Sequence, residues 1–305
     1  MLALFIPWLL LVLLFVIVIL LFKQKWKTAI VGGIIVIAIN NWSECIPYRI
    51  CSIDRGCGNS LKVFVFNAEG SGEDTRIKGQ GILDLVNETN PDVVFISEFF
   101  GRNAYYLDSL LSSIFPYSTF PQFGTPHYFY SKYPLTNSRR IRSANAFEPG
   151  VFSCDMLVGN DTIHLHGCHL ASNNYDEAKH HSPVDSIRSF SNIPSTFNNV
   201  NIACEKRYEN IELLIREMNK PFRTLVMGDM NDVGGSPCIT VLENAGFFDS
   251  WWEGGVGYGA TIHRPLPYRI DHIMHSDGLL LNRITRIDSN GISDHDGLYA
   301  EFSIE

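Results

Sequence analysis

The sequence predicts an α/β fold in which β-sheets are covered by helices. Two segments, LKVFVF (61–66) and DVVFIS (92–97), are apolar at both odd and even positions, which is typical of strands buried on both faces. Two other segments, 76–88 and 205–219, repeat apolar residues at the spacing of one helix face. Strands and helices therefore alternate along the chain, an order typical of sheets packed against helices.

Residues 1–46 are predicted to form an N-terminal transmembrane helical hairpin. The first 22 residues carry no charged side chain, and about 20 apolar residues suffice to span a bilayer. They lack the basic start, short apolar core and small-residue cleavage site of a secretory signal. A second apolar stretch begins at residue 28 and is long enough to span at a tilt if it continues to about residue 48.

The loop between the two apolar stretches is basic, with Lys23, Lys25 and Lys27. By the positive-inside rule this loop stays in the cytoplasm, which places the rest of the chain on the extracytoplasmic side of the membrane. If only the first stretch spans, the same lysines hold the rest of the chain in the cytoplasm. We expect the hairpin, with the lipid bilayer as partner of residues 1–46, a linker at 47–60 and one domain at 61–305.

The domain that follows the hairpin is acidic. Residues 1–50 contain four of the 24 Lys and Arg residues and one of the 32 Asp and Glu residues, so 20 basic and 31 acidic side chains remain, a formal charge of −11. Proteins that grip long nucleic acid normally present a net basic face, because affinity depends on neutralising phosphates. The balance argues against a dedicated DNA-binding protein. The seven cysteines include no CxxC pair, which argues against a zinc ribbon.

Polar side chains gather where the predicted strands end or begin. Each alone could simply form a turn, because Asp and Asn favour turns. Together they would crowd negative charge at one edge of the sheets, which costs several kcal/mol unless a metal or an imidazolium compensates. An oxygen-rich cluster with few histidines and no cysteine suits Mg²⁺ or Mn²⁺ rather than zinc. The residues are Asn67 and Glu69 after 61–66, Glu98 after 92–97, His169 within 162–170, Asp229 and Asn231 after 224–227, Asp271 within 269–276, and Asp294 and His295 before the final strand.

Six short motifs in this order resemble those of the endonuclease/exonuclease/phosphatase superfamily, the deoxyribonuclease-I-like phosphoesterases. They are VFNAEG, PDVVFISE, HLHGCHLAS, VMGDMND, RIDHI and GISDHDG. The resemblance covers residues 61–305 and implies a four-layer sandwich, in which two packed mixed β-sheets are flanked by helices. It also implies metal-dependent hydrolysis of a phosphate ester. Residues 172–204 lie outside the resemblance, and we expect them to form a mobile loop near the site.

The resemblance implies a set of metal ligands. Glu98 is the principal Mg²⁺ ligand on this interpretation, since a carboxylate is the hard ligand that this ion prefers. Asn67, Glu69 and Asp294 complete or neighbour the metal sphere, partly through water. Some relatives have Asp where this chain has Glu69, and the longer side chain leaves direct ligation by Glu69 open.

The resemblance also implies roles in catalysis. His295 lies beside the phosphate, and Asp271 accepts a hydrogen bond from its other ring nitrogen, which fixes the tautomer. Asp229 orients or deprotonates the attacking water, and Asn231 holds Asp229 or a phosphate oxygen. His169 donates to a non-bridging phosphate oxygen. Both Asp229 and the His295–Asp271 pair remain candidates for the general base.

We therefore expect a membrane-tethered, Mg²⁺-dependent phosphoesterase with its catalytic domain at 61–305. Its substrate is a phosphodiester or a phosphomonoester, in nucleic acid or in a phospholipid or small phosphoester. No protein partner is evident from the sequence. The alternative from another class is a non-catalytic, membrane-anchored binding module that retains the fold, since one fold hosts unrelated functions.

Overall fold

The structure is a computed structural model, and it describes most of the chain. The described residues are 2–38, 52–55, 60–69, 75–121, 125–141, 150–173, 193–218, 221–263 and 267–305. The catalytic domain predicted at 61–305 is therefore described apart from several internal segments. Most of the predicted linker at 47–60 lies outside the described residues.

Two six-stranded sheets are built from the described residues. Each is mixed, because β1 and β2 are parallel in the first, β7 and β8 are parallel in the second, and their other pairs are antiparallel. The first sheet has the order β11 (Leu279–Ile287), β12 (Gly297–Ile304), β1 (Leu61–Asn67), β2 (Val93–Ser97), β4 (Tyr128–Ser131), β3 (Tyr117–Ser118). The second has the order β5 (Leu135–Ile141), β6 (Gly150–Val158), β7 (Asp161–His169), β8 (Thr224–Asp229), β10 (Asp271–Ser276), β9 (Phe247–Asp249).

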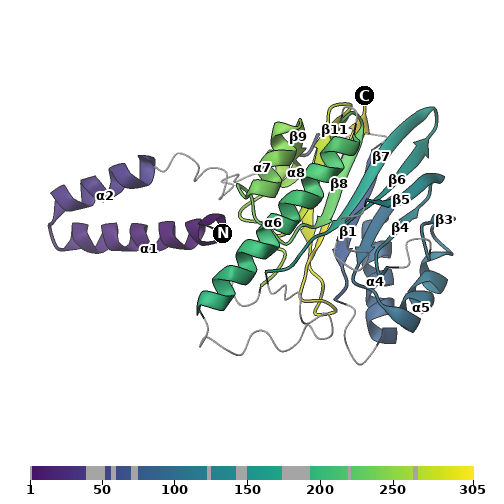
Figure 1. The fold of residues 1–305 in the computed structure, drawn as a ribbon, viewed down its shortest axis with the longest axis horizontal. Coiled ribbons are helices and arrows are strands. Elements are labelled where there is room, and N and C mark those ends of the chain that lie inside the picture. Colours follow the sequence, from purple (N-terminus) through teal and green to yellow (C-terminus); the bar gives the residue numbers. More distant parts are fainter. Residues whose placement is uncertain are drawn as a thin grey trace.

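The sheets pack face to face and carry helices on their outer faces (Figure 1). Val65 and Phe95 of the first sheet share one apolar core with Leu165 and Met227 of the second. A second core joins the first sheet to α4 and α5, and a third joins the other sheet to α6 and α7. The predicted α/β fold with two packed mixed sheets flanked by helices is confirmed. The helices of the domain are α4 (Thr75–Thr89), α5 (Gly101–Leu111), α6 (Ile193–Glu217), α7 (Pro237–Asn244) and α8 (Ser250–Gly254).

Two glycines let the sheets approach closely near the ends of β7 and β8. A Cβ atom at Gly167 would lie 2.1 Å from the Phe95 ring of the opposite sheet. A Cβ atom at Gly228 would lie 2.2 Å from the carbonyl oxygen of Cys168, and its φ of +126° also favours glycine. Only glycine fits at these positions. In the motif VMGDMND, Gly228 is therefore required for packing, and it directly precedes the polar residue Asp229.

The helix α6 corrects one prediction. Its residues 193–204 belong to the segment expected to be a mobile loop, and they form the first turns of a helix of 25 residues. The Asn-rich composition favours a loop, but Ala203 is fully buried and Val200 packs against the apolar pair Val233 and Ile270. Burial of one helix face therefore outweighs weak helix propensity. Residues 174–192 lie outside the described residues.

Two apolar helices, α1 (Leu2–Phe22) and α2 (Trp26–Ala38), precede the domain. They lie side by side as a helical hairpin (Figure 1). Within the described part of the chain, no helix is both long and apolar enough to cross a membrane. The transmembrane character of this hairpin stays a prediction.

Candidate active site

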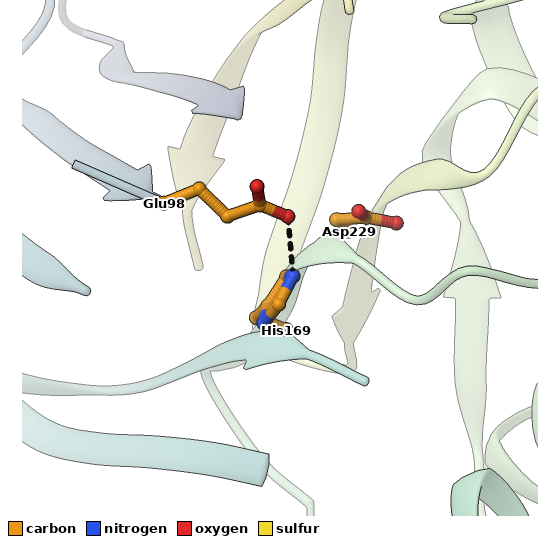
Figure 2. A group of neighbouring side chains, drawn as sticks. All are labelled: Glu98, His169 and Asp229. Atoms are coloured by element: carbon orange, nitrogen blue, oxygen red, sulfur yellow. Dashed lines mark hydrogen bonds and ion pairs between the residues drawn. The ribbon is translucent and has the colours of Figure 1, made fainter. Parts of the chain in front are cut away.

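Four strands bring polar side chains to one edge where the two sheets meet. In the first sheet, β1 ends at Asn67, and its parallel neighbour β2 is followed by Glu98. In the second, β7 ends at His169 and β8 at Asp229, and these two residues are paired in register. Figure 2 shows Glu98 directed toward His169, with Asp229 beside them. The carboxyl ends of parallel strands are the usual place for ligand binding in α/β folds.

Hydrogen bonds join these four side chains into one network. The Nε2 of His169 lies 2.6 Å from Oε1 of Glu98. The Asn67 amide donates to Oε1 of Glu98 at 3.1 Å and to Oδ2 of Asp229 at 3.0 Å, so it bridges the two carboxylates. Glu98, His169 and Asp229 each offer one ligand atom within 4.8 Å of the others. The site is therefore compact and built from both sheets.

A histidine paired with an acid completes the network on the other side of Asp229. The Nδ1 of His295 lies 2.8 Å from Oδ2 of Asp271, and both residues are buried. Because Asp271 accepts the Nδ1 proton, Nε2 faces Asp229, whose Oδ2 is 3.9 Å away. Asp229 and Asp271 are register partners in β8 and β10. The arrangement places an imidazole between two carboxylates.

Asn231 fixes the orientation of Asp229. Its backbone N–H donates to Oδ1 of Asp229 at 2.8 Å, and its side-chain amide donates to Oδ2 at 3.1 Å. The same amide donates to the carbonyl oxygen of Leu170 at 3.0 Å. The φ of Asn231 is +50°, a left-handed conformation that Asn tolerates better than most residues. Both oxygens of Asp229 are thus held by the loop that follows β8.

Two predicted metal ligands lie farther out. The Glu69 carboxylate pairs with Lys78 at 3.3 Å and its side chain is 41% exposed, while only its backbone N–H contacts Asn67. It lies in neither cluster of ligand atoms found among the described residues. The Asp294 carboxylate lies 4.0 Å from Nε2 of His295 and is 42% exposed. The structure thus brings Asn67, Glu98, His169, Asp229, Asn231, Asp271 and His295 together, with Asp294 at the rim and Glu69 directed away.

The protonation states follow from burial and from the neighbouring charges. Burial alone would raise the pKa of Glu98, but the charge and hydrogen bond of His169 and the Asn67 amide lower it to about 2. Burial and the Asp271 carboxylate raise the pKa of Asp229 to about 6. Burial would lower the pKa of His295, but Asp271 outweighs it and raises the value to about 10. At neutral pH His295 is protonated, and Asp229 is mostly ionised.

In EDTA, the free energy of unfolding is expected to fall by about 2–4 kcal/mol as the pH rises from about 7 to about 10. The folded pKa of His295 is about 10, above the usual value of about 6.5. The stabilisation is therefore complete below about pH 6.5 and is lost as the pH rises through the folded pKa. Urea denaturation at each pH measures it. A His295→Asn variant with the same alkaline slope would contradict this assignment.

The donor set fits a divalent cation. Two carboxylates, Glu98 and Asp229, converge from opposite sheets with few nitrogen ligands, which suits a hard ion such as Mg²⁺ or Mn²⁺. The raised pKa of Asp229 reflects buried negative charge that a cation would compensate. The amide oxygen of Asn67 accepts from the Glu69 N–H, so Asn67 presents its NH₂ group to the carboxylates.

One site residue not predicted from the sequence is His127, which lies directly before β4. It is 5% exposed, and its ring centroid lies 4.8 Å from that of His169. Burial, together with the nearby charges of His169 and Arg140, keeps the pKa of His127 well below its usual value. Its sequence signal was its position at the start of the apolar segment HYFYS, part of a stretch, HYFYSKYPL, that resembles a family segment. The sequence does not reveal that this segment pairs with the strand that ends before Glu98.

A buried arginine, also missed, supports the loops around the site. Arg207 of α6 is 1% exposed. Its guanidinium donates to Oδ2 of Asp232 at 3.0 Å, to the carbonyl oxygen of Ala171 at 2.8 Å and to Oδ1 of Asn173 at 3.0 Å. These partners follow β7 and β8, directly beyond His169 and Asp229. Arg207 therefore ties together the two loops that carry half of the site.

Arg207→Met is expected to lower the free energy of unfolding by about 3–5 kcal/mol, because it leaves the buried Asp232 carboxylate without its cation. Urea denaturation of the full chain in mild detergent measures the change. The matched control is Arg216→Met in the same helix. The Arg216 side chain is 70% exposed, so its replacement should change the free energy of unfolding by less than about 0.5 kcal/mol. Equal effects of the two substitutions would show that the buried ion pair contributes nothing.

Two packed sheets with outer helices, and a carboxylate–histidine cluster at their shared edge, define the class of deoxyribonuclease-I-like phosphoesterases. Residues 64–295 match the Endonuclease/Exonuclease/phosphatase family, so the chain belongs to that family, whose members are metal-dependent phosphoesterases. Comparison with curated protein sequences gives no significant match.

Solved structures share the fold at low sequence identity. TDP2 from D. rerio, in complex with a single-strand DNA product, is 16% identical, with a TM-score of 0.56 over 80% of this chain and 99% of that one. An endonuclease/exonuclease/phosphatase from Beutenbergia cavernae is 15% identical, with a TM-score of 0.57 over 80% and 72%. Beta toxin from Staphylococcus aureus is 17% identical, with a TM-score of 0.53 over 79% and 99%. At sequence identities this low, the comparison shows that the fold is shared.

Proposed function

We propose that this chain is a membrane-tethered, Mg²⁺-dependent phosphoesterase, with Mn²⁺ as the alternative ion. Its substrate is a phosphodiester or phosphomonoester in nucleic acid, a phospholipid or a small phosphoester. One observation carries the proposal. Glu98 and Asp229 converge from opposite sheets at a buried edge that also holds His169 and the His295–Asp271 pair. This combination supplies a cation site, a base and proton donors within one cluster.

Glu98 would be the principal ligand of the cation, with Asn67 beside it, and Asp229 would stay free to act on the attacking water. When bound, the cation supplies Lewis-acid stabilisation of the charge that develops on the phosphate and the leaving oxygen. Asn67 already joins the two carboxylates through its amide, which fixes their spacing. Glu98 stays ionised over the whole range of working pH, because its pKa is lowered to about 2.

Asp229 is the general base that the geometry favours over the His295–Asp271 pair. Without the cation, burial and the Asp271 carboxylate raise its pKa to about 6, so it is ionised near neutral pH and can accept a proton from water. Asn231 donates to both of its oxygens and holds it in one orientation. His295 is already protonated at that pH, since its pKa is about 10, and a protonated imidazole cannot accept the proton.

His169 and His295 are the proton donors of the site. The pKa of each is raised, in spite of burial, by a neighbouring carboxylate, Glu98 for His169 and Asp271 for His295. Imidazolium N–H groups fixed in a water-poor site stabilise negative charge that develops on phosphate oxygens. Asp271 holds the His295 ring with Nε2 facing the cluster, so this donor needs no rearrangement during the reaction.

Three considerations bear on the substrate class, and they do not all point to the same substrate. The structurally similar TDP2 contains a single-strand DNA product, which supports nucleic acid. The net charge of −11 outside residues 1–50 weakens the case for tight binding to a duplex. A membrane tether would place lipid head groups within reach, which supports a phospholipid.

The tether is proposed for residues 1–46, with the catalytic domain on the extracytoplasmic side. Hairpin side chains such as Val12, Phe15 and Phe22 are more than half exposed, and an apolar surface of this kind is unfavourable in water. Lys23, Lys25 and Lys27 lie at the turn, and the positive-inside rule supports a cytoplasmic position for that turn. A reporter fused after Glu305 that is active only in the cytoplasm would refute this orientation.

The experiment that tests the activity uses the full chain in mild detergent with Mg²⁺ or with EDTA. Substrates are plasmid DNA, single-stranded oligonucleotides, sphingomyelin and phosphoinositide vesicles, and a chromogenic phosphodiester. We expect turnover of at least one substrate with Mg²⁺ and none in EDTA. Oligonucleotide cleavage alone would assign a tethered nuclease, and vesicle turnover alone a lipid phosphoesterase. The absence of any turnover would instead favour a non-catalytic binding module.

A further inference from the structure

Glu98 leaves β2 in a backbone conformation that needs support. Its φ is +57°, in the left-handed region that costs a non-glycine residue about 1–2 kcal/mol. This turn directs the carboxylate toward His169 and Asn67 at the edge of the sheets. Strained conformations persist only where the surrounding structure holds them, and they concentrate at functional sites.

The segment before β4 holds this turn through two backbone hydrogen bonds. The N–H of Glu98 donates to Nδ1 of His127 at 3.4 Å, and the N–H of Phe99 donates to the carbonyl oxygen of Pro126 at 3.1 Å. β4 is the antiparallel neighbour of β2, with Tyr128 opposite Ile96. The sheet itself therefore brings His127 beside the backbone of Glu98.

The ring of His127 also supports His169. Its centroid lies 4.8 Å from that of His169 with the planes 30° apart, and 4.6 Å from that of Phe152 with the planes 38° apart. Tilted rings at such distances restrict each other's orientation by packing. His127 thus contacts both members of the Glu98–His169 pair, one through a ring nitrogen and the other through a ring face.

We infer that His127 is a positioning residue of the cation site, which holds Glu98 through its backbone N–H and His169 through ring packing. Nδ1 can accept this hydrogen bond only when it carries no proton, so the ring proton is on Nε2. The inference rests on the proposed function in one respect, namely that Glu98 binds a divalent cation. Residues that orient metal ligands typically change metal affinity about 10–100-fold when they are replaced.

Mn²⁺ binding to the full chain in detergent, followed by electron paramagnetic resonance, tests the inference without any substrate. His127→Phe keeps a ring for packing but removes the acceptor, and it should raise the dissociation constant about tenfold or more. His127→Asn places an amide oxygen where Nδ1 lies but removes the ring that packs on His169, so it should weaken binding less than His127→Phe does. The control is His166→Phe, a buried histidine hydrogen-bonded to Ser153, which should leave the affinity unchanged.

The outcomes separate this inference from the proposed function. If the parent chain binds no Mn²⁺, both are overturned. If the parent binds Mn²⁺ and His127→Phe binds it equally well, only the role of His127 is overturned. Equal weakening by His127→Phe and His127→Asn would overturn the assigned hydrogen bond to Nδ1. Circular dichroism checks the fold, and if His127→Phe does not fold, His127→Leu takes its place as the variant without an acceptor.

Discussion

Replacing His295 with alanine is expected to lower kcat about 10²–10⁴-fold, the range for loss of a positioned proton-transfer or charge-stabilising group. The reason is geometric. The protonated ring is held 2.8 Å from Asp271, and its Nε2 lies 3.9 Å from Asp229, the proposed base. Its removal takes away the proposed donor to the phosphate and a positive charge that favours the ionised form of Asp229. Steady-state kinetics with the substrate identified by the panel measures the loss.

The control for His295→Ala is His164→Ala, a histidine that also pairs with an aspartate but is 46% exposed on an outer sheet face. It should leave kcat unchanged. Asp271→Asn should weaken catalysis on its own but add little to His295→Ala, because residues that act as one unit are not additive. Fully additive losses would show that Asp271 does not act through His295.

The α/β class of the domain could be predicted because its strands and helices carry strong local patterns, whereas the four-layer arrangement was implied by the family resemblance. Segments such as 61–66 and 92–97 are apolar on both faces, and they form β1 and β2 at almost the expected bounds. The start of α6 could not be predicted, because the burial of Ala203 depends on contacts with distant segments. The composition of an Asn-rich segment does not reveal that distant parts of the chain provide an apolar surface against which it packs as a helix.

The predicted site residues lie at strand ends, and strand ends are visible in a sequence. Asn67, Glu98, His169 and Asp229 meet because β1 and β2, and likewise β7 and β8, are parallel neighbours. His127 could not be found in this way, because its place beside Glu98 depends on the pairing of β4 with β2. For Glu69 the sequence suggests a role at the site that the side-chain contacts do not support. Its spacing after Asn67 suggests a ligand, yet Lys78 pairs with its carboxylate.

Glu98→Gln is expected to lower the rate at moderate Mg²⁺ concentration by about 10³-fold or more, since a bound metal contributes several kcal/mol of transition-state stabilisation. Glutamine has the size of glutamate but lacks its charge, so packing changes little and the loss reports on cation binding. It also removes the partner that raises the pKa of His169. Rates measured against Mg²⁺ concentration should show a raised half-saturation value together with a lower plateau.

The matched control is Glu69→Gln, which changes the same chemical group two residues beyond Asn67. Its carboxylate is 41% exposed and paired with Lys78, and exposed ion pairs contribute only about 0–1 kcal/mol. We therefore expect a rate and an Mg²⁺ dependence close to those of the parent chain. A larger loss in Glu69→Gln than in Glu98→Gln would mean that Glu69 turns inward to bind the ion. The ligand set would then follow the sequence motif rather than the side-chain positions of the structure.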